Sequence, residues 1–301
     1  MDLPTRQQCL TELAGRAHGR GMDHDHDFDW AAMADMLVDE GEAYSPYLVA
    51  AFDRLADPEP KRILDIGSGP GVAACLLAER FPGAEVIAVD GTPELLARAE
   101  ERAGRLGVRL QTQVAEFPAG LGELPEADLV WSANVVHHVG DQQGALTRMA
   151  ALLRPGGTLA IAEGGLPTRW LPRDIGFGRP GLQLRLEVAM AERFDRMRAE
   201  LPDSAPVTED WPAMLRAAGL VEAHSRSFLV DRPAPLEEGP RRSVRQWFER
   251  LRGMQADHLD PDDRAALDRL LNPDDPQSID RRPDLFLLTA RTVHYAHRPA
   301  G

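Results

Sequence analysis

The sequence predicts an α/β protein whose helices cover a doubly wound sheet of seven strands. Three observations support this prediction. Short apolar runs alternate with helical patterns from Lys61 onward. A glycine-rich turn, Gly67–Gly71, directly follows the first run. The acidic residue Asp90 ends the next run, about twenty residues further on.

The predicted elements follow from periodicity and from helix-end signals. Thr92 is placed to cap a helix that has Pro93 in its first turn. The tetrapeptide Arg154-Pro155-Gly156-Gly157 is typical of a helix stop followed by a turn. The predicted strands are Arg62–Ile66, Glu85–Asp90, Arg109–Ala115, Asp128–Ala133, Thr158–Glu163, Ser225–Val230 and Asp284–His294. The predicted helices in this part are Val72–Arg80, Pro93–Arg105, Gln142–Leu153, Leu182–Leu201 and Trp211–Gly219.

The chain divides at a Pro-rich segment, Ala56–Pro60. We expect residues 1–58 to form an N-terminal helical cap or lid that contains Trp30, Tyr44 and Tyr47, and each of these aromatics is expected in the core rather than in contact with a substrate. Residues 59–301 then form the core, with helical insertions at about 164–202 and 235–283.

Composition restricts the partners. The chain has 301 residues and a formal net charge of −14, with only short basic clusters such as Arg241-Arg242 with Arg245, so nucleic acid is not an expected partner. We find no signal peptide and no apolar stretch long enough to span a bilayer, so no membrane partner is expected. Two distant cysteines favour a reducing compartment, and we expect a cytoplasmic protein.

The glycine turn indicates a nucleotide-type ligand. Glycine allows sharp turns and close approach of the backbone, and the N-terminus of the following helix favours anionic or polar groups. The spacing Gly67, Gly69, Gly71 lacks the third glycine that a dinucleotide fingerprint requires, since position 72 is Val. Asp90 lies where a carboxylate can accept from both hydroxyls of a ribose.

Ile63–Gly71, Asp90, Glu116-Phe117 and Leu152–Leu159 occur in the order and spacing of one family. Together they resemble class I S-adenosylmethionine-dependent methyltransferases of the small-molecule type. The resemblance covers residues 61–165. It implies a Rossmann-like sheet of seven strands with the last strand antiparallel, and S-adenosylmethionine as the cofactor.

The resemblance also assigns cofactor contacts. Asp65 would meet the methionine ammonium, and Asp90 the ribose. Glu116 would accept from the adenine amino group, with Phe117 on the adenine face, although this position is more often aspartate in the family. The implied cofactor-binding set is Asp65, Gly67, Ser68, Gly69, Gly71, Asp90, Gly91, Glu116, Phe117 and Asn134.

Three side chains are candidates for catalysis. His137 follows the fourth strand, at the sheet edge where doubly wound folds bind ligands, and an imidazole with a pKa near 6.5 suits a general base. In some similar O-methyltransferases of small phenols, a histidine at about this position is the general base. The alternative is that His137 only packs under the cofactor. His138 is the second candidate, and Glu163, which ends the fifth strand, is a base or a substrate anchor.

Two further patterns are weaker evidence for a function. His24 and His26 alternate with aspartates and could share a metal ion, but nothing fixes further ligands, so we expect an acidic loop and no metal. Trp170, Arg173, Phe177 and the helix after Leu182 are candidates for substrate specificity. The Trp247-Phe248 pair could instead form a subunit interface, which leaves a homodimer open.

The predicted function is methyl transfer to a small organic acceptor with an O-, N- or C-nucleophile. A natural-product intermediate is preferred, partly because Lys61 is the only lysine in a chain rich in Arg, Ala, Gly and Pro. The alternatives are a cyclase or binding protein that keeps the cofactor, an NAD-dependent oxidoreductase, and an RNA or protein methyltransferase.

Overall fold

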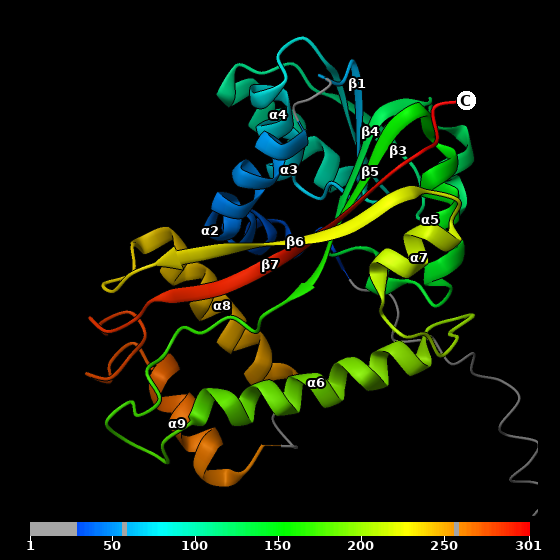
Figure 1. Ribbon diagram of the computed structural model, residues 1–301. Helices are drawn as coiled ribbons and strands as arrows, with labels where there is room; N and C mark the ends of the chain where they lie inside the picture. Colours follow the sequence, from blue (N-terminus) through cyan, green and yellow to red (C-terminus); the bar gives the residue numbers. More distant parts are fainter. Residues whose placement is uncertain (1–28, 56–58, 256–258) are drawn as a thin grey trace, which may run out of the picture.

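The computed structural model describes residues 29–55, 59–255 and 259–301. Seven strands form one sheet in the order β3-β2-β1-β4-β5-β7-β6, and β7 is antiparallel to both of its neighbours. The predicted doubly wound sheet with an antiparallel last strand is therefore confirmed (Figure 1). The strands are β1 Arg62–Ile66, β2 Glu85–Asp90, β3 Gln111–Val114, β4 Ala127–Ala133, β5 Leu153–Gly165, β6 Val221–Arg232 and β7 Leu287–His297.

Helices cover both faces of the sheet because the central strands are apolar on both sides. Along β1, Ile63 faces the cluster that holds α2 and α3, whereas Leu64 faces the cluster that holds α5 and α7. This alternation follows from the period of two in a strand. The helices are α2 Ala34–Phe52, α3 Val72–Arg80, α4 Pro93–Leu106, α5 Gln142–Ala151, α6 Leu182–Glu200, α7 Trp211–Ala217, α8 Glu238–Gln255 and α9 Pro261–Leu271.

The predicted helix stop at residues 154–157 is wrong. Helix α5 ends at Ala151, and residues 154–157 already belong to β5. The reason is pairing with the end of the chain, since Gly156 N donates to Arg298 O over 3.0 Å and Arg298 N donates to Gly157 O over 2.9 Å. These long-range bonds override a local turn pattern.

The N-terminal segment packs onto the sheet through α2, a single helix that continues through Pro46. Its buried Tyr47 and Phe52 belong to the core cluster that contains Ile63 and Trp131. The boundary between a cap, residues 1–58, and the remaining core stays a prediction.

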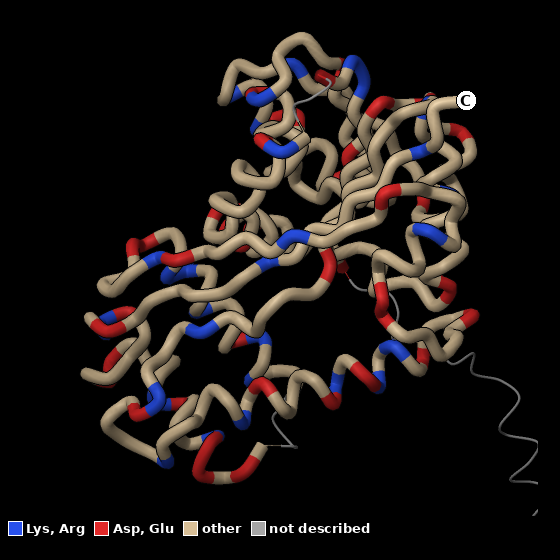
Figure 2. Tube along the Cα trace, in the orientation of Figure 1, with Lys and Arg blue, Asp and Glu red and all other residues tan. Residues whose placement is uncertain are grey.

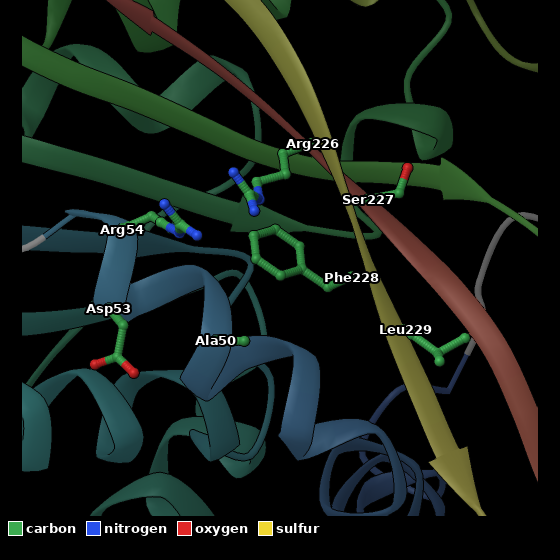
Figure 3. A pocket seen from close by; sticks show the side chains of 7 residues that line it. All are labelled: Ala50, Asp53, Arg54, Arg226, Ser227, Phe228 and Leu229. Carbon is green, nitrogen blue, oxygen red and sulfur yellow. The ribbon is translucent and has the colours of Figure 1, made fainter.

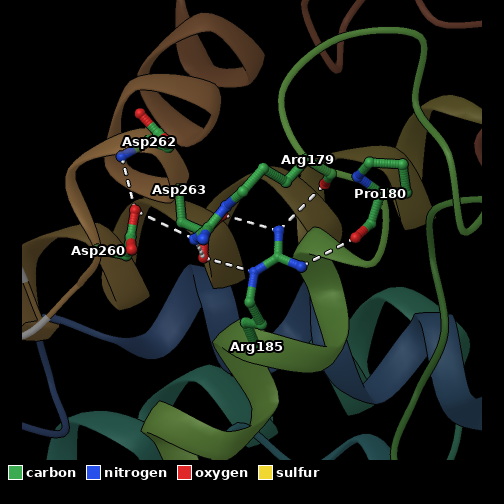
Figure 4. A network of polar contacts seen from close by, with 6 residues as sticks. All are labelled: Arg179, Pro180, Arg185, Asp260, Asp262 and Asp263. Atoms are coloured by element: carbon green, nitrogen blue, oxygen red, sulfur yellow. Dashed lines mark hydrogen bonds and ion pairs between the residues drawn. The ribbon is translucent and has the colours of Figure 1, made fainter.

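The insertions form a layer beside the extended ends of β6 and β7 (Figure 1). Figure 4 shows the start of α6 tied to α9 by Arg179 and Arg185, which both contact the buried carboxylate of Asp263. The Arg185 guanidinium is the main cause that lowers the pKa of Asp263. Acidic and basic residues alternate along α6 and do not gather into one patch (Figure 2). No helix among the described residues meets the length and apolarity that a membrane crossing requires.

Candidate active site

The glycine loop joins β1 to α3 in a conformation that only glycine adopts readily. Gly67, Gly69 and Gly71 have φ values of 69°, 53° and 77°. A Cβ on Gly67 would lie 2.3 Å from a methyl of Val135, and one on Gly71 would lie 2.5 Å from the Cβ of Ala99. A Cβ on Gly69 would meet nothing within 4 Å, so the backbone is open to a ligand at that point.

Asp65, just before this loop, is a buried acid without a partner for one oxygen. Its side chain is 2% exposed, and Oδ2 has no hydrogen-bond partner among the described residues. Desolvation, followed by the charge of Asp90, raises the pKa of Asp65 to about 7. Ser68 Oγ is likewise buried and unpartnered within the described residues. A buried carboxylate of this kind fits a ligand that brings a positive, hydrogen-bonding group.

Asp90 contacts the glycine loop, and Glu116 lies beside Gly91, the residue that follows Asp90. Asp90 Oδ2 accepts from Gly69 N over 2.9 Å, and its Oδ1 accepts from Thr92 N over 2.9 Å. Each oxygen keeps a second lone pair for a ligand hydroxyl. The Glu116 carboxylate lies 3.1 Å from the position of a Cβ on Gly91, so Gly91 permits this approach. Phe117 is partly buried against the core beneath.

Asn134 turns the chain at the end of β4. It has a left-handed φ of 57°, a conformation in which Asn is enriched, and its N–H donates to Ala162 O over 3.0 Å. A single 3-10 turn at Val136–His138 follows, while the Val135 side chain lies against Gly67. The turn thus packs Val135 against the glycine loop and places His137 two residues beyond this contact.

His137 and Glu163 form a hydrogen-bonded pair. His137 Nδ1 lies 2.8 Å from Glu163 Oε2, and Glu163 Oε1 accepts from the backbone N–H groups of Val135 and Val136. Glu163 is 4% exposed, whereas the His137 side chain is 21% exposed. With Nδ1–H directed at the carboxylate, His137 Nε2 keeps a free lone pair.

Glu163 lies within a β-bulge of β5, and sequence reasoning did not identify the residues that contact its backbone there. The register against β7 shifts between Ala162 and Gly165. His294 Nε2 lies 3.1 Å from the carbonyl oxygen of Glu163, and its Nδ1 lies 2.7 Å from Ser225 Oγ. Hydropathy marks His294 only as part of a strand, so no local signal identifies this contact.

His138 lies beside the pair. Its ring centroid is 4.2 Å from that of His137 and 5.3 Å from that of Trp30. Desolvation by the surrounding protein, then the charge of His137, lowers the pKa of His138. The ring is therefore neutral at pH 7, and it contributes shape and polarity beside His137. Phe194 of α6, which the sequence did not single out, has its ring centroid 5.6 Å from His137.

The other aromatic candidates make contacts within the protein. Tyr44 Oη lies 3.0 Å from Thr168 Oγ1, on the side of α2 that faces the insertion. Trp170 packs on Trp247 with centroids 4.4 Å apart. The suggested Trp247-Phe248 interface is wrong for Phe248, which is fully buried inside this chain. Two candidates for substrate contacts remain predictions: Phe177 packs under Arg269, and Arg173 is exposed.

A hollow elsewhere on the protein is not this site. It measures about 470 Å³ and lies between α2 and β6, lined by Ala50, Asp53, Arg54, Arg226, Ser227, Phe228 and Leu229 (Figure 3). None of the predicted site residues contributes to it.

The proposed metal pair, His24 and His26, lies outside the described residues. Within the described ranges, no three His, Cys, Asp or Glu side chains are arranged to hold a metal ion.

Comparisons with known proteins agree with this geometry. Residues 64–159 match the family described as "Methyltransferase domain". A trans-aconitate 2-methyltransferase from Pseudomonas aeruginosa is 37% identical over 177 residues, which are 54% of this chain and 62% of that protein. A demethylmenaquinone methyltransferase from Thermus thermophilus is 36% identical over 118 residues, 38% of this chain and 51% of that protein.

The chain thus spans between about half and three-fifths of the length of these relatives. A solved structure from Nostoc punctiforme, a provisionally assigned O-methyltransferase, superposes with a TM-score of 0.50 at 18% identity. The superposed region covers 73% of this chain and 64% of the Nostoc protein, and this similarity supports the fold.

Proposed function

We propose that this chain, which belongs to the class I S-adenosylmethionine-dependent methyltransferases, transfers a methyl group to a small organic acceptor whose proton His137 removes. The observation that carries the proposal is the pair of His137 and Glu163, formed next to the glycine loop. The remainder of the site then holds the cofactor and orients the base.

The residues present fit S-adenosylmethionine. When bound, this cofactor supplies an electrophilic methyl group on a sulfonium. The unpartnered Oδ2 of Asp65 would accept from the methionine ammonium. Asp90 would accept from the ribose hydroxyls through its spare lone pairs, and Glu116 with Phe117 would hold the adenine. The backbone of Gly67, Gly69 and Gly71, with Ser68, Gly91 and Asn134, would line the same edge.

His137 would act through Nε2. A hydroxyl or amine acceptor loses its proton to Nε2 while the acceptor atom attacks the methyl group, and the imidazolium that forms is stabilised by Glu163. Both carboxylate oxygens of Glu163 accept hydrogen bonds from protein groups, so its proposed role is to position His137 and not to contact substrate. In-line attack needs little else than orientation of the reacting atoms.

A second candidate is an acceptor whose nucleophile is a carboxylate. The name of the Pseudomonas relative favours it, because trans-aconitate is a carboxylic acid. The Thermus relative is named for a different acceptor, demethylmenaquinone, so the relatives do not agree on one substrate class. Neither name points to the natural-product intermediate that composition favoured. A carboxylate is already ionised at pH 7 and needs no base, so the effect of replacing His137 separates the two candidates.

Calorimetric titration tests the choice of cofactor. We expect S-adenosylmethionine to bind and NAD to give no heat of binding. Binding of NAD without S-adenosylmethionine would overturn the proposal, since it would reassign the site to an oxidoreductase. Binding of S-adenosylmethionine without release of labelled methyl groups to any acceptor would instead favour a cyclase or a binding protein.

The proposal includes a small-molecule partner and a cytoplasmic setting. The net charge of −14 supports a metabolite over a nucleic acid, and the cysteine usage supports a reducing compartment. A homodimer is the remaining proposal, and sedimentation velocity of the full chain tests it.

A further inference from the structure

The 3-10 turn that carries His137 is held from outside by helix α6. Arg198, in the last turn of α6, donates from one guanidinium nitrogen to the carbonyl oxygen of His137 over 2.9 Å, and also to the carbonyl oxygen of Val139. The last carbonyls of a helical turn have no partners within that turn, and an arginine side chain is a suitable donor for them. Arg198 therefore fixes the backbone of the turn at two points.

The same face of α6 also contacts the His137 side chain. Phe194 lies four residues before Arg198, and residues four apart share one face of a helix. Its ring centroid is 5.6 Å from that of His137. Phe194 is 38% exposed, so burial in the core does not explain its place beside the imidazole. Helix α6 thus meets both the backbone and the ring of His137.

The end of α6 is pressed closely against the residue that follows the turn. A Cβ on Gly140 would lie 2.0 Å from the carbonyl oxygen of Pro202 and 2.6 Å from the nitrogen of Ser204, so glycine is required for this approach. Ser204 Oγ in turn donates to the carbonyl oxygen of Arg198 over 2.8 Å. These contacts fix the end of the helix relative to the turn.

The start of α6 is anchored on the segment that follows β5. The buried Gln183 side chain accepts from the backbone N–H groups of Trp170 and Leu171, over 3.0 and 3.1 Å. Gln183 lies about three turns before Phe194 and so on the same face of the helix. Helix α6 therefore spans from this segment to the His137 turn, although it lies outside the part of the chain that matches the methyltransferase family, residues 64–159.

We propose that Arg198 and Phe194 are positioning residues for His137, so that the inserted helix α6 orients the base together with Glu163. The inference rests on the proposed function, because it concerns how the base of that reaction is held. A hydrogen bond from Nδ1 to Glu163 fixes one nitrogen of the ring, whereas the direction of Nε2 also depends on the backbone to which the ring is attached. A small displacement of a catalytic group lowers the rate strongly, so this support matters for turnover.

Nitrogen-15 NMR of the full chain, labelled at histidine, tests the inference without turnover. Loss of one signal in His137→Asn identifies His137 among the nine histidines. At pH 8, we expect the native His137 to hold its proton on Nδ1 alone. Arg198→Met should show both tautomers, because a loosened turn lets the ring leave Glu163.

Kinetics with a hydroxyl or amine acceptor provide the second measurement. We expect Arg198→Met to lower kcat by about ten- to hundredfold and to leave KM for S-adenosylmethionine unchanged. Arg198→Lys should restore most of kcat, since an ammonium still donates to a carbonyl. In a His137→Asn background, Arg198→Met should lower kcat no further, because the base that it orients is gone.

A matched control comes from the same helix. Arg196 lies on α6 two residues from Phe194 and is exposed, and Arg196→Met should keep the native tautomer and the native kcat. Phe194→Leu is a milder variant that removes the ring contact and keeps Arg198, and it should also show both tautomers. It carries the test if the melting curve of Arg198→Met shows that this protein does not fold.

Three outcomes overturn the inference. The first is a native tautomer in folded Arg198→Met, or in Phe194→Leu where Arg198→Met does not fold. The second is a loss of kcat in Arg198→Met that persists in the His137→Asn background, and the third is a loss that Arg198→Lys does not restore. A native kcat in His137→Asn alone would instead contradict the proposed function, and the NMR result would still show whether α6 positions the ring.

Discussion

His137 Nδ1 lies 2.8 Å from Glu163 Oε2, and the two residues come from the ends of neighbouring strands, β4 and β5. The carboxylate also accepts two backbone N–H groups of the turn that carries the histidine. The pair is therefore fixed on both sides. This arrangement directs His137 Nε2 away from Glu163, as a general base for an acceptor proton requires.

Replacing the base should slow chemistry and not cofactor binding. For a hydroxyl or amine acceptor, we expect His137→Asn to lower kcat by about 10²- to 10⁴-fold, because the proton then has no acceptor. Steady-state kinetics at saturating cofactor from pH 6 to 9 checks this. Glu163→Gln should lower kcat less and shift its pH profile, since it changes the partner of Nδ1 and leaves Nε2 in place.

Unchanged turnover in His137→Asn across this pH range would leave the histidine with a packing role only. That result would favour an acceptor that is already ionised, such as a carboxylate. His138→Asn serves as the neighbouring control and should retain most activity, because the His138 ring is neutral and a weak base at pH 7.

Cofactor binding should require the ionised form of Asp65. Its pKa of about 7 means that the carboxyl is about half protonated at pH 7 and must lose its proton before it pairs with an ammonium group. Affinity should therefore fall below pH 7 and level off above it, and binding at pH 6 should release a proton. Calorimetry in two buffers with different ionisation enthalpies measures that proton.

Asp65→Asn should remove this proton release and weaken binding. Asp53→Asn, an exposed acid at the end of α2, is the control and should change neither quantity. Proton release that persists in Asp65→Asn would show that another group titrates on binding.

The same carboxyl should affect the stability of the ligand-free protein. Its folded pKa lies above its unfolded value, so the folded state binds more protons and stability is lost as pH rises from about 4 toward 8. Asp65→Asn should consequently raise the melting temperature at pH 8 more than at pH 5. Equal shifts at both pH values would contradict the raised pKa.

The glycine loop should not tolerate a methyl group at Gly67. Gly67→Ala combines a left-handed φ with a Cβ 2.3 Å from Val135, so we expect a loss of about 2 kcal/mol or more in urea unfolding. Val135→Ala in the same chain should recover part of it by removing the clash. Gly104→Ala, inside α4 with nothing near its Cβ, should instead stabilise by about 0.5–1 kcal/mol.

The contact between α6 and α9 should weaken in acid. Arg185 holds the pKa of Asp263 below its ordinary value, so this pair contributes stability above the unfolded pKa and loses it as pH falls through the folded pKa. Asp263→Asn should lower the melting temperature at pH 7, and the difference should shrink as the pH approaches 3. A difference that stays constant with pH would show that charge plays no part.

The central sheet could be predicted because local and long-range preferences agree there. The apolar run of β1 is buried on both faces, as a parallel strand between two layers of helices requires. At residues 154–157 the local and long-range preferences disagree. Pairing with the chain end near Arg298 there prevails over the local Pro-Gly-Gly turn pattern.

The site divides in the same way. Spacing placed Asp65, Asp90 and Glu116 at one edge, because Asp65 and Asp90 lie at the carboxyl ends of the parallel strands β1 and β2 and Glu116 comes just after β3. The pairing of His137 with Glu163 joins the turn after β4 to a bulge in β5, where His294 of β7, about 130 residues away along the sequence, contacts the Glu163 carbonyl oxygen.

Transfer of labelled methyl groups tests the central claim most directly. The full chain is incubated with methyl-labelled S-adenosylmethionine and a bacterial extract, and the products are separated by size. We predict label in a small-molecule fraction, reduced in the Asp65→Asn protein. Label confined to protein or RNA, or an equal yield with Asp65→Asn, would contradict the account.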